Sequence, residues 1–125
     1  MRVHLSTLRS ILLKSVAEIK FVRRRPQPGQ LSSRRMLCTN SSAFLNSAKG
    51  RIALNYRPPQ NLPHYNPSAK NLVITWDIFM QDYRTINVDS CDVISVIPAN
   101  EKFWEYFTEK LSKMTPDEKV AFMNI

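Results

Sequence analysis

The chain has 125 residues, of which 18 are Lys or Arg and 10 are Asp or Glu, so its formal net charge is +8 at pH 7. Its longest apolar run, residues 72–76, is much shorter than the about 20 residues that a membrane-spanning helix needs, which excludes a membrane span. The two cysteines, Cys38 and Cys91, are too few for a disulfide framework.

The basic residues are concentrated in the first part of the chain. Residues 1–76 contain thirteen bases and one acid, Glu18, whereas residues 77–125 contain five bases and nine acids. An arginine-rich and acid-poor N-terminus is typical of a mitochondrial presequence, and we interpret residues 1–44 in this way. The presequence residues that carry the charge are Arg2, Arg9, Lys14, Arg23, Arg24 and Arg25.

The two halves of this presequence are expected to differ in structure. Residues 1 to about 19 alternate apolar side chains with basic and hydroxyl ones, which predicts a basic amphipathic helix. An inside-negative membrane potential of 100 mV attracts each positive charge by about 2.3 kcal/mol. The residues that follow are rich in Pro, Gly, Gln and Ser and lack apolar periodicity, so we expect them to be disordered.

Residues 34–44 resemble a matrix processing site, with an arginine two positions before the first cut. Residues 37–44 correspond to an octapeptide that a second protease removes at such sites, but the fourth residue, Asn40, departs from the usual Ser, Thr or Gly. We expect the mature chain to begin between Leu37 and Leu45. The processing region comprises Arg35, Met36, Leu37 and Phe44.

Removal of the presequence would change the charge of the protein. From Leu45 onward the chain has nine bases and nine acids, so the mature chain has almost no net charge. A neutral chain attracts phosphates weakly, and we expect it to make no direct contact with nucleic acid. Two alternatives stay open for the basic N-terminus, namely a nucleic-acid-binding arm and a solvated tail.

Residues 45–70 contain four prolines and are expected to form an extended arm, because proline removes a backbone donor and disfavours helix before it. The arm either lies along a groove of a partner protein or acts as a linker packed on its own domain. Candidate partner-binding residues in the arm and in the domain that follows are Tyr56, Pro58, Pro59, Leu62, Tyr65, Trp76, Trp104 and Tyr106.

Residues 71–125 are predicted to form a small, mostly helical domain. Four large apolar residues at helical spacing predict a helix over residues 76–86. The β-branched residues 92–97 predict a short strand, which either pairs in parallel with residues 71–75 or stays unpaired.

Two further helices are predicted near the C-terminus. Asn100 is a suitable N-cap for the first, and Thr115, Pro116 and Glu118 provide a capping box with proline at the first helical position for the second. The expected fold class is therefore mainly α, with at most a short two-stranded β element, after a disordered presequence and an extended Pro-rich arm. The many aromatic residues in so small a domain suggest that a partner covers some of them.

Few residues of the predicted mature chain are suited to catalysis. His64 is its only histidine and no glycine follows Gly50, which excludes a histidine-based metal cluster, a catalytic triad and a phosphate-binding loop. Cys91 has an acidic neighbour and no histidine nearby in sequence, which is typical of an inert thiol. We therefore expect no enzymatic activity, no cofactor and no metal.

One short segment resembles a known family. Residues 111–119, within the segment 104–123, are similar to a helix start in fungal subunit-IV-type proteins of cytochrome c oxidase, over less than a fifth of the chain. The membrane-spanning helix of that family is missing from this sequence. The resemblance points towards the respiratory chain without implying membership of the family.

The expected function is that of a non-catalytic mitochondrial interaction protein, either an assembly factor or a peripheral accessory subunit of a respiratory-chain complex. The alternative is a small protein of the mitochondrial ribosome or gene-expression machinery. We expect it in the matrix or on the matrix face of the inner membrane. Its expected partners are a mitochondrial protein complex and the import and processing machinery.

Overall fold

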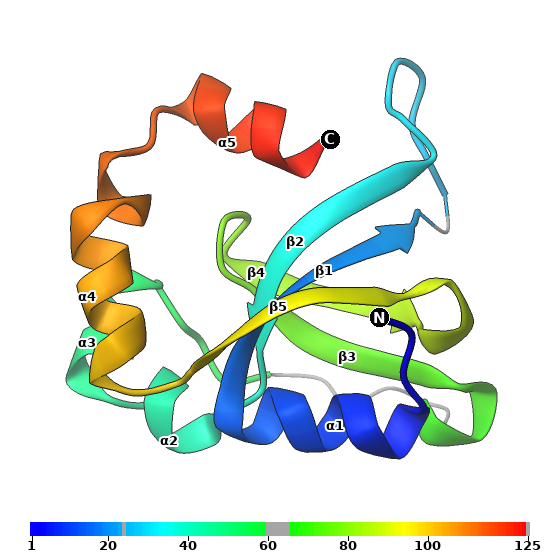
Figure 1. Ribbon diagram of the computed structural model, residues 1–125, viewed down its shortest axis with the longest axis horizontal. Coiled ribbons are helices and arrows are strands. Elements are labelled where there is room, and N and C mark those ends of the chain that lie inside the picture. Colours follow the sequence, from blue (N-terminus) through cyan, green and yellow to red (C-terminus); the bar gives the residue numbers. More distant parts are fainter. Residues whose placement is uncertain (24, 60–65, 125) are drawn as a thin grey trace.

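The computed structural model describes residues 1–23, 25–59 and 66–124. The chain forms a five-stranded antiparallel sheet with the strand order β4-β3-β2-β1-β5, and helices lie along its ends and sides (Figure 1). The expectation of a mainly α fold behind a disordered presequence is therefore wrong. The fold is a mixed α/β one in which the N-terminal residues take part.

Two strands of the sheet lie in the expected presequence, where we predicted a helix to about residue 19 and disorder after it. β1 (Ser15–Val22) and β2 (Ser33–Thr39) pair antiparallel from Ala17 opposite Cys38 to Val22 opposite Ser33. Alternate residues of these strands are buried on one face of the sheet, because successive side chains of a strand point to opposite sides. Residues of this buried row in β1 and β2 are Ala17, Ile19, Phe21, Met36 and Cys38.

The helix that begins the chain covers this row. α1 (Leu5–Lys14) buries Leu8 and Leu12, which lie one helical turn apart and are both 0% exposed. The helix runs along one end of the sheet (Figure 1). The predicted amphipathic helix thus exists, but its apolar face packs on β1 and β2 of the same protein.

The predicted processing region also belongs to the core. Met36 is 0% exposed, and Leu37 and Phe44 are each 5% exposed. Arg35 forms an ion pair with Glu18, the only acid of the N-terminal segment, with 2.9 Å between Nη2 and Oε2. The basic residues suggested a targeting signal, whereas the apolar residues that alternate with them fill the core.

The helix predicted over residues 76–86 is also wrong, because these residues form a β-hairpin. β3 (Leu72–Asp77) and β4 (Asp82–Asn87) pair antiparallel, and Trp76 lies opposite Tyr83. Oδ1 of Asp77 accepts hydrogen bonds from the backbone N–H groups of Phe79 and Met80, each at 3.1 Å, which tightens the turn between the strands. The spacing that suggested a helical face arises from residues on both sides of this turn.

The predicted strand over residues 92–97 is confirmed as β5 (Asp92–Pro98). It pairs antiparallel with β1, so the parallel pairing with residues 71–75 that the sequence left open does not occur. The ladders of the sheet differ in length, since β3 and β4 share six residue pairs whereas β2 and β3 share two, Cys38 with Asp77 and Thr39 with Trp76.

The two C-terminal helices are confirmed. α4 (Glu101–Glu109) is capped by Asn100, whose side chain accepts from the backbone N–H of Lys102 at 2.9 Å. α5 (Pro116–Met123) begins with the expected capping box between Thr115 and Glu118. No helix of the described residues is long and apolar enough to cross a membrane.

The expected extended arm is interrupted by short helices. α2 (Ser42–Leu45) and α3 (Ala48–Ala53) are joined so closely that a side chain at Gly50 would lie 2.4 Å from the carbonyl oxygen of Phe44. Residues 60–65 of the predicted arm lie outside the described residues. The described part of the chain also contains three single-turn 3₁₀ helices, at Ser68–Lys70, Val88–Ser90 and Leu111–Lys113.

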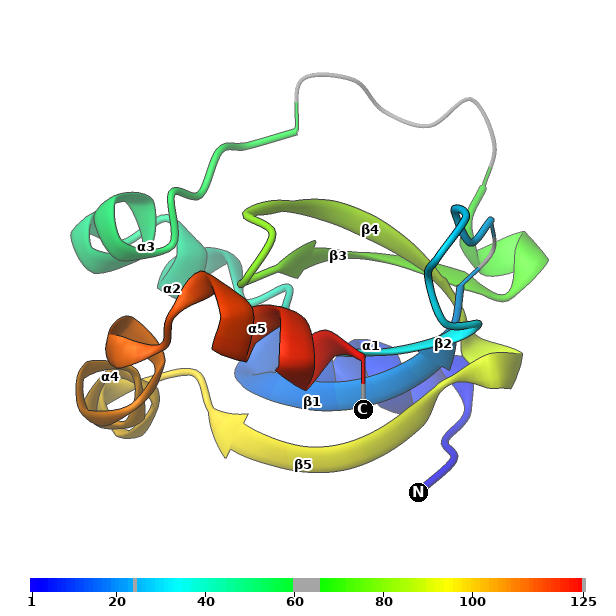
Figure 2. The same cartoon turned by 90° about the horizontal axis from the view of Figure 1, so that it is seen from above.

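The aromatic residues that suggested a covering partner largely pack on one another. The Phe44 ring stacks on Trp104 with 4.8 Å between centroids and meets Phe103 edge-on at 5.3 Å. Figure 2 shows α2, α3 and α4 gathered at one end of the sheet, where this second cluster lies. Phe44 and Val16 of the cluster come from the segment that was expected to be removed, so the core is larger than the sequence analysis assumed.

We predict that a chain beginning at Leu37 cannot keep this fold, because it lacks α1, β1 and most of β2. Thermal unfolding followed by circular dichroism should be cooperative for the full chain and should lose its cooperative transition after truncation. A truncated chain with a cooperative transition at the same temperature would instead support the predicted division near residue 44.

Candidate functional site

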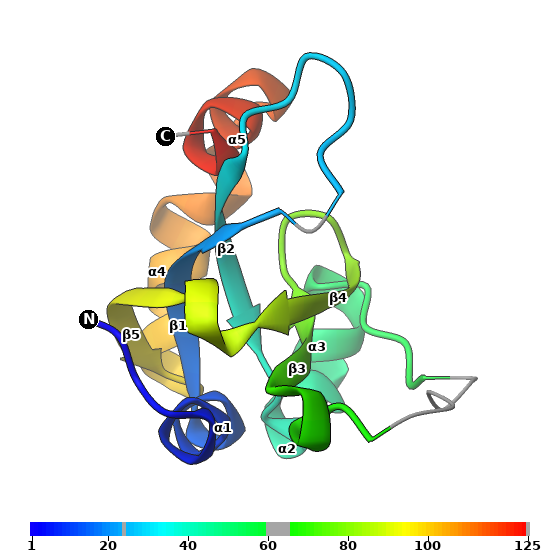
Figure 3. The same cartoon turned by 90° about the vertical axis from the view of Figure 1, so that its right-hand side faces the viewer.

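A cleft of about 510 Å³ opens where the inner strands, the β4 strand and the last helix meet. This volume lies within the roughly 300–1,000 Å³ of typical ligand sites. The β1–β2 loop projects beyond the sheet beside α5 (Figure 3). Residues of this loop form part of the wall of the cleft. Its lining consists of Phe21, Arg23, Arg25, Gly29, Gln30, Arg34, Met80, Arg84, Thr85, Val120, Met123 and Asn124.

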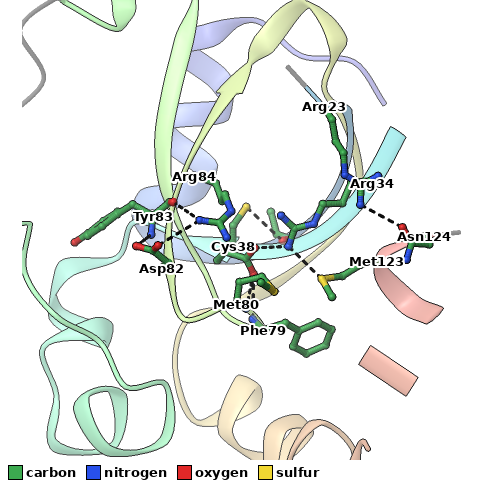
Figure 4. Close-up of polar contacts among 12 residues, drawn as sticks. Arg23, Arg34, Cys38, Phe79, Met80, Asp82, Tyr83, Arg84, Met123 and Asn124 are labelled. Atoms are coloured by element: carbon green, nitrogen blue, oxygen red, sulfur yellow. Dashed lines mark hydrogen bonds and ion pairs between the residues drawn. The ribbon is translucent and has the colours of Figure 1, made fainter. Parts of the chain in front are cut away.

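The described lining of the cleft includes four arginines and no carboxylate. Arg23 directly follows β1, Arg25 lies in the β1–β2 loop, Arg34 is on β2 and Arg84 is on β4. Figure 4 shows Arg34 between Arg84 on one side and Arg23 with Asn124 on the other. Four positive groups therefore meet at one surface although they come from two strands and the β1–β2 loop.

Arg34 is fixed by a buried ion pair. Its Nη2 donates to Oδ2 of Asp77, and the two side chains are 9% and 0% exposed. The same nitrogen lies 3.2 Å from the sulfur of Met123 on α5. Because Asp77 also accepts from the backbone of the β3–β4 turn, the ion pair connects β2 to that turn.

Arg23 is held by neutral acceptors. It donates to the backbone carbonyls of Leu31 and Ser33 and to Oδ1 of Asn124 at 3.2 Å. Burial lowers the pKa of Arg23, and the positive charge of Arg34 lowers it further. The positive charge of Arg23 is therefore not neutralised by an ion pair with any described residue, and a bound anion would compensate it.

The other two arginines differ in their surroundings. Arg84 lies 3.4 Å from Oδ2 of Asp82 and donates to the backbone carbonyl of Tyr83 at 2.9 Å. Arg25 is exposed and forms no ion pair with a described residue. Arg23 and Arg25 thus carry the uncompensated charge of the cleft.

The last helix forms one wall of the cleft through a few side chains. The guanidinium carbon of Arg35 lies 4.2 Å from the ring centroid of Phe122, which is a cation–π contact. The Phe122 ring also meets Phe79 edge-on at 5.2 Å between centroids. None of the described residues of α5 is fully buried, so these contacts and those of Met123 and Asn124 hold it.

Most of the predicted partner-binding residues lie away from this cleft. Trp76 and Trp104 are buried, and Tyr106 is half-buried on α4. Tyr56 is half-buried against Trp76, with ring centroids 5.0 Å apart. Pro58 and Pro59 are exposed, whereas Leu62, Tyr65 and His64 lie outside the described residues.

The predicted presequence residues are divided between two places. Arg2 donates to the carbonyl of Asp89 and Arg9 to Oγ of Ser68, so both bind other parts of the fold. Lys14 is exposed at the end of α1. Arg23 and Arg25 line the cleft, and Arg24 lies outside the described residues.

The convergence of these basic residues on one cleft was not predicted from the sequence. The cluster at residues 23–25 was the available signal, and it was interpreted as part of an import signal. No local pattern links these residues to Arg34 or Arg84, because the strands bring them together across long stretches of sequence.

The two cysteines are both buried. Burial raises the pKa of the Cys91 thiol to about 11, and the carboxylate of Asp92 contributes to the shift. Burial also raises the pKa of Cys38. Among the described residues, no three His, Cys, Asp or Glu side chains are grouped so that they could hold a metal ion.

Comparison with known proteins gives no match, whether with protein families, with curated proteins or with solved structures. The similarity of residues 111–119 to cytochrome c oxidase proteins therefore gains no support. In the structure these residues form a 3₁₀ turn and the start of α5.

We predict that Asp77→Asn destabilises the protein by about 3–5 kcal/mol, because the substitution leaves the buried Arg34 without its counter-charge. Asparagine keeps the oxygen that accepts from the turn, so the change isolates the ion pair. Asp82→Asn removes an exposed partner of Arg84 and should cost at most about 1 kcal/mol. Urea unfolding of both variants measures the difference, and equal losses would contradict the importance of the buried pair.

We predict that both thiols resist alkylation by iodoacetamide at pH 8 in the folded protein and react in urea. The thiolate is the reactive form, and burial with a raised pKa makes it scarce. Mass spectrometry should show labelling at least about a hundredfold slower than in the unfolded chain. Rapid labelling of Cys91 under native conditions would show that this thiol is accessible.

Proposed function

We propose that this protein is a non-catalytic binding protein whose cleft takes a phosphate-bearing ligand. The observation that carries the proposal is the convergence of four arginines on a lining that contains no carboxylate among the described residues. A guanidinium group presents a planar fork of donors that matches the oxygens of a phosphate. Arg23 and Arg25 supply positive charge that no described carboxylate neutralises.

The groups that line the cleft also favour binding over catalysis. The described lining contains no carboxylate, imidazole or thiol that could act as a general base or nucleophile. It does contain apolar side chains beside the arginines, including Phe21, Met80 and Val120. A ligand with a phosphate and an apolar portion would use both kinds of contact.

The role of residues 1–44 in the fold removes the reason for preferring one of the two functions expected from the sequence. The respiratory-chain function was preferred because a chain without residues 1–44 is neutral. Those residues supply α1, β1 and β2, so a chain that keeps this fold also keeps the basic residues and the charge of +8. The proposal therefore favours the gene-expression alternative, in which a protein meets phosphates, while a location in mitochondria stays a prediction.

Binding of pyrophosphate tests the proposal. Isothermal titration calorimetry should detect pyrophosphate binding to the full chain, and Arg25→Gln should weaken it at least about tenfold, because a hydrogen bond to a charged group contributes about 1.5–3 kcal/mol. The control is Arg57→Gln, which removes an equal charge from another exposed position outside the cleft lining. The proposal fails if pyrophosphate does not bind or if the two variants weaken binding equally.

A further inference from the structure

We propose that the phosphates bound in this cleft belong to a single-stranded nucleic acid, with its backbone on the arginines and a base against the apolar lining. This inference rests on the proposed function, because it names the class of ligand for the same site. It is carried by the number of arginines that line the cleft, by the exposed apolar residues of the same lining and by the charge of the chain.

The four arginines of the cleft offer more hydrogen-bond donors than one phosphate accepts. Arg84, Arg34 and Arg23 belong to β4, β2 and the end of β1, and the strand order places β4 and β1 three positions apart. The sheet curls so that β1 and β4 also contact each other, which brings these arginines around one cleft. A single phosphate cannot accept hydrogen bonds from all four guanidinium groups of this cleft, whereas successive phosphates of a strand can.

Exposed apolar surface lies next to these charges. Met80 is 47% exposed and Val120 is 52% exposed, and both line the cleft together with the largely buried Phe21. Such surfaces suit the flat face of an unpaired base, which is accessible in a single strand and covered by its neighbours in a duplex. Gln30 and Thr85 add neutral donors and acceptors in the same lining.

The charge of the whole chain favours a polymer over a small anion. The net charge of +8 provides a long-range attraction for a polyanion, and this attraction adds to the local contacts of the cleft. Arg25 is exposed and belongs to the β1–β2 loop, which projects beyond the sheet (Figure 3). A mononucleotide would use only part of this arrangement.

Fluorescence anisotropy with a labelled 12-residue oligouridine measures the predicted binding, with oligothymidine of equal length, a 12-base-pair duplex and a phosphoserine peptide of equal charge as competitors. We expect the single strand to bind at least a hundredfold more tightly than pyrophosphate at 100 mM salt. The slope of log K against log salt should be about −2 to −3, since each phosphate contact of a single strand contributes about 0.7. Equal binding of both single strands assigns recognition to phosphates and bases, and a preference for the ribose strand adds contacts to the 2′-hydroxyl.

Three variants separate the contribution of charge to binding from the contribution of apolar contact with a base. Arg25→Gln should reduce the magnitude of the salt slope by about 0.7, whereas Arg57→Gln should leave the slope unchanged. Met80→Ala should weaken binding of the strand at least fivefold and leave pyrophosphate binding as it is. Because Arg25 and Met80 are exposed, these variants should stay folded, which circular dichroism checks.

The outcomes distinguish this inference from the proposed function. Pyrophosphate binding that depends on Arg25, without tighter binding of the single strand, would overturn the inference and leave the proposed function standing. Preference for the duplex or for the phosphoserine peptide would also overturn it, and the latter would assign the cleft to a protein partner. If neither pyrophosphate nor the strand responds to Arg25→Gln, both proposals fail.

Discussion

The buried ion pair between Arg34 and Asp77 determines much of the geometry of this protein. Two charges removed from water are stable only when they satisfy each other, so their positions leave little freedom. The pair fixes β2 against the β3–β4 turn, and Asp77 organises that turn with its second oxygen. Arg34 in turn contacts Met123 of α5 and raises the local positive potential around Arg23. One interaction thus connects the sheet, the last helix and the charge of the cleft.

The basic residues before position 44 belong to the folded protein, and this changes the interpretation of the net charge. Seen in the sequence, the basic residues before position 44 belong to a segment that can be removed. Seen in the structure, they alternate with residues that fill the core, and Glu18 and Arg35 pair across β1 and β2. Arg23 and Arg25, which were assigned to a mitochondrial targeting signal, therefore line the cleft of the folded protein.

Sequence reasoning succeeded where structure depends on local chemistry. The caps of α4 and α5 and the β-branched strand β5 follow from neighbouring residues, and each was predicted. It failed for the β3–β4 hairpin, because Trp76 and Tyr83 meet either on one face of a helix or across a hairpin, and only the turn at Asp77 decides between them. The cleft could be predicted least, since Arg84 joins the other arginines only through the order of strands.

The short ladder between β2 and β3 divides the sheet into two unequal mechanical units. β5, β1 and β2 form one, and the β3–β4 hairpin forms the other, with two residue pairs and the buried ion pair along the seam. Arg23 and Arg34 stand on the first unit and Arg84 on the second. Any change of twist between these two units therefore alters the distances between the guanidinium groups. The twist of the sheet thus sets the width of the cleft.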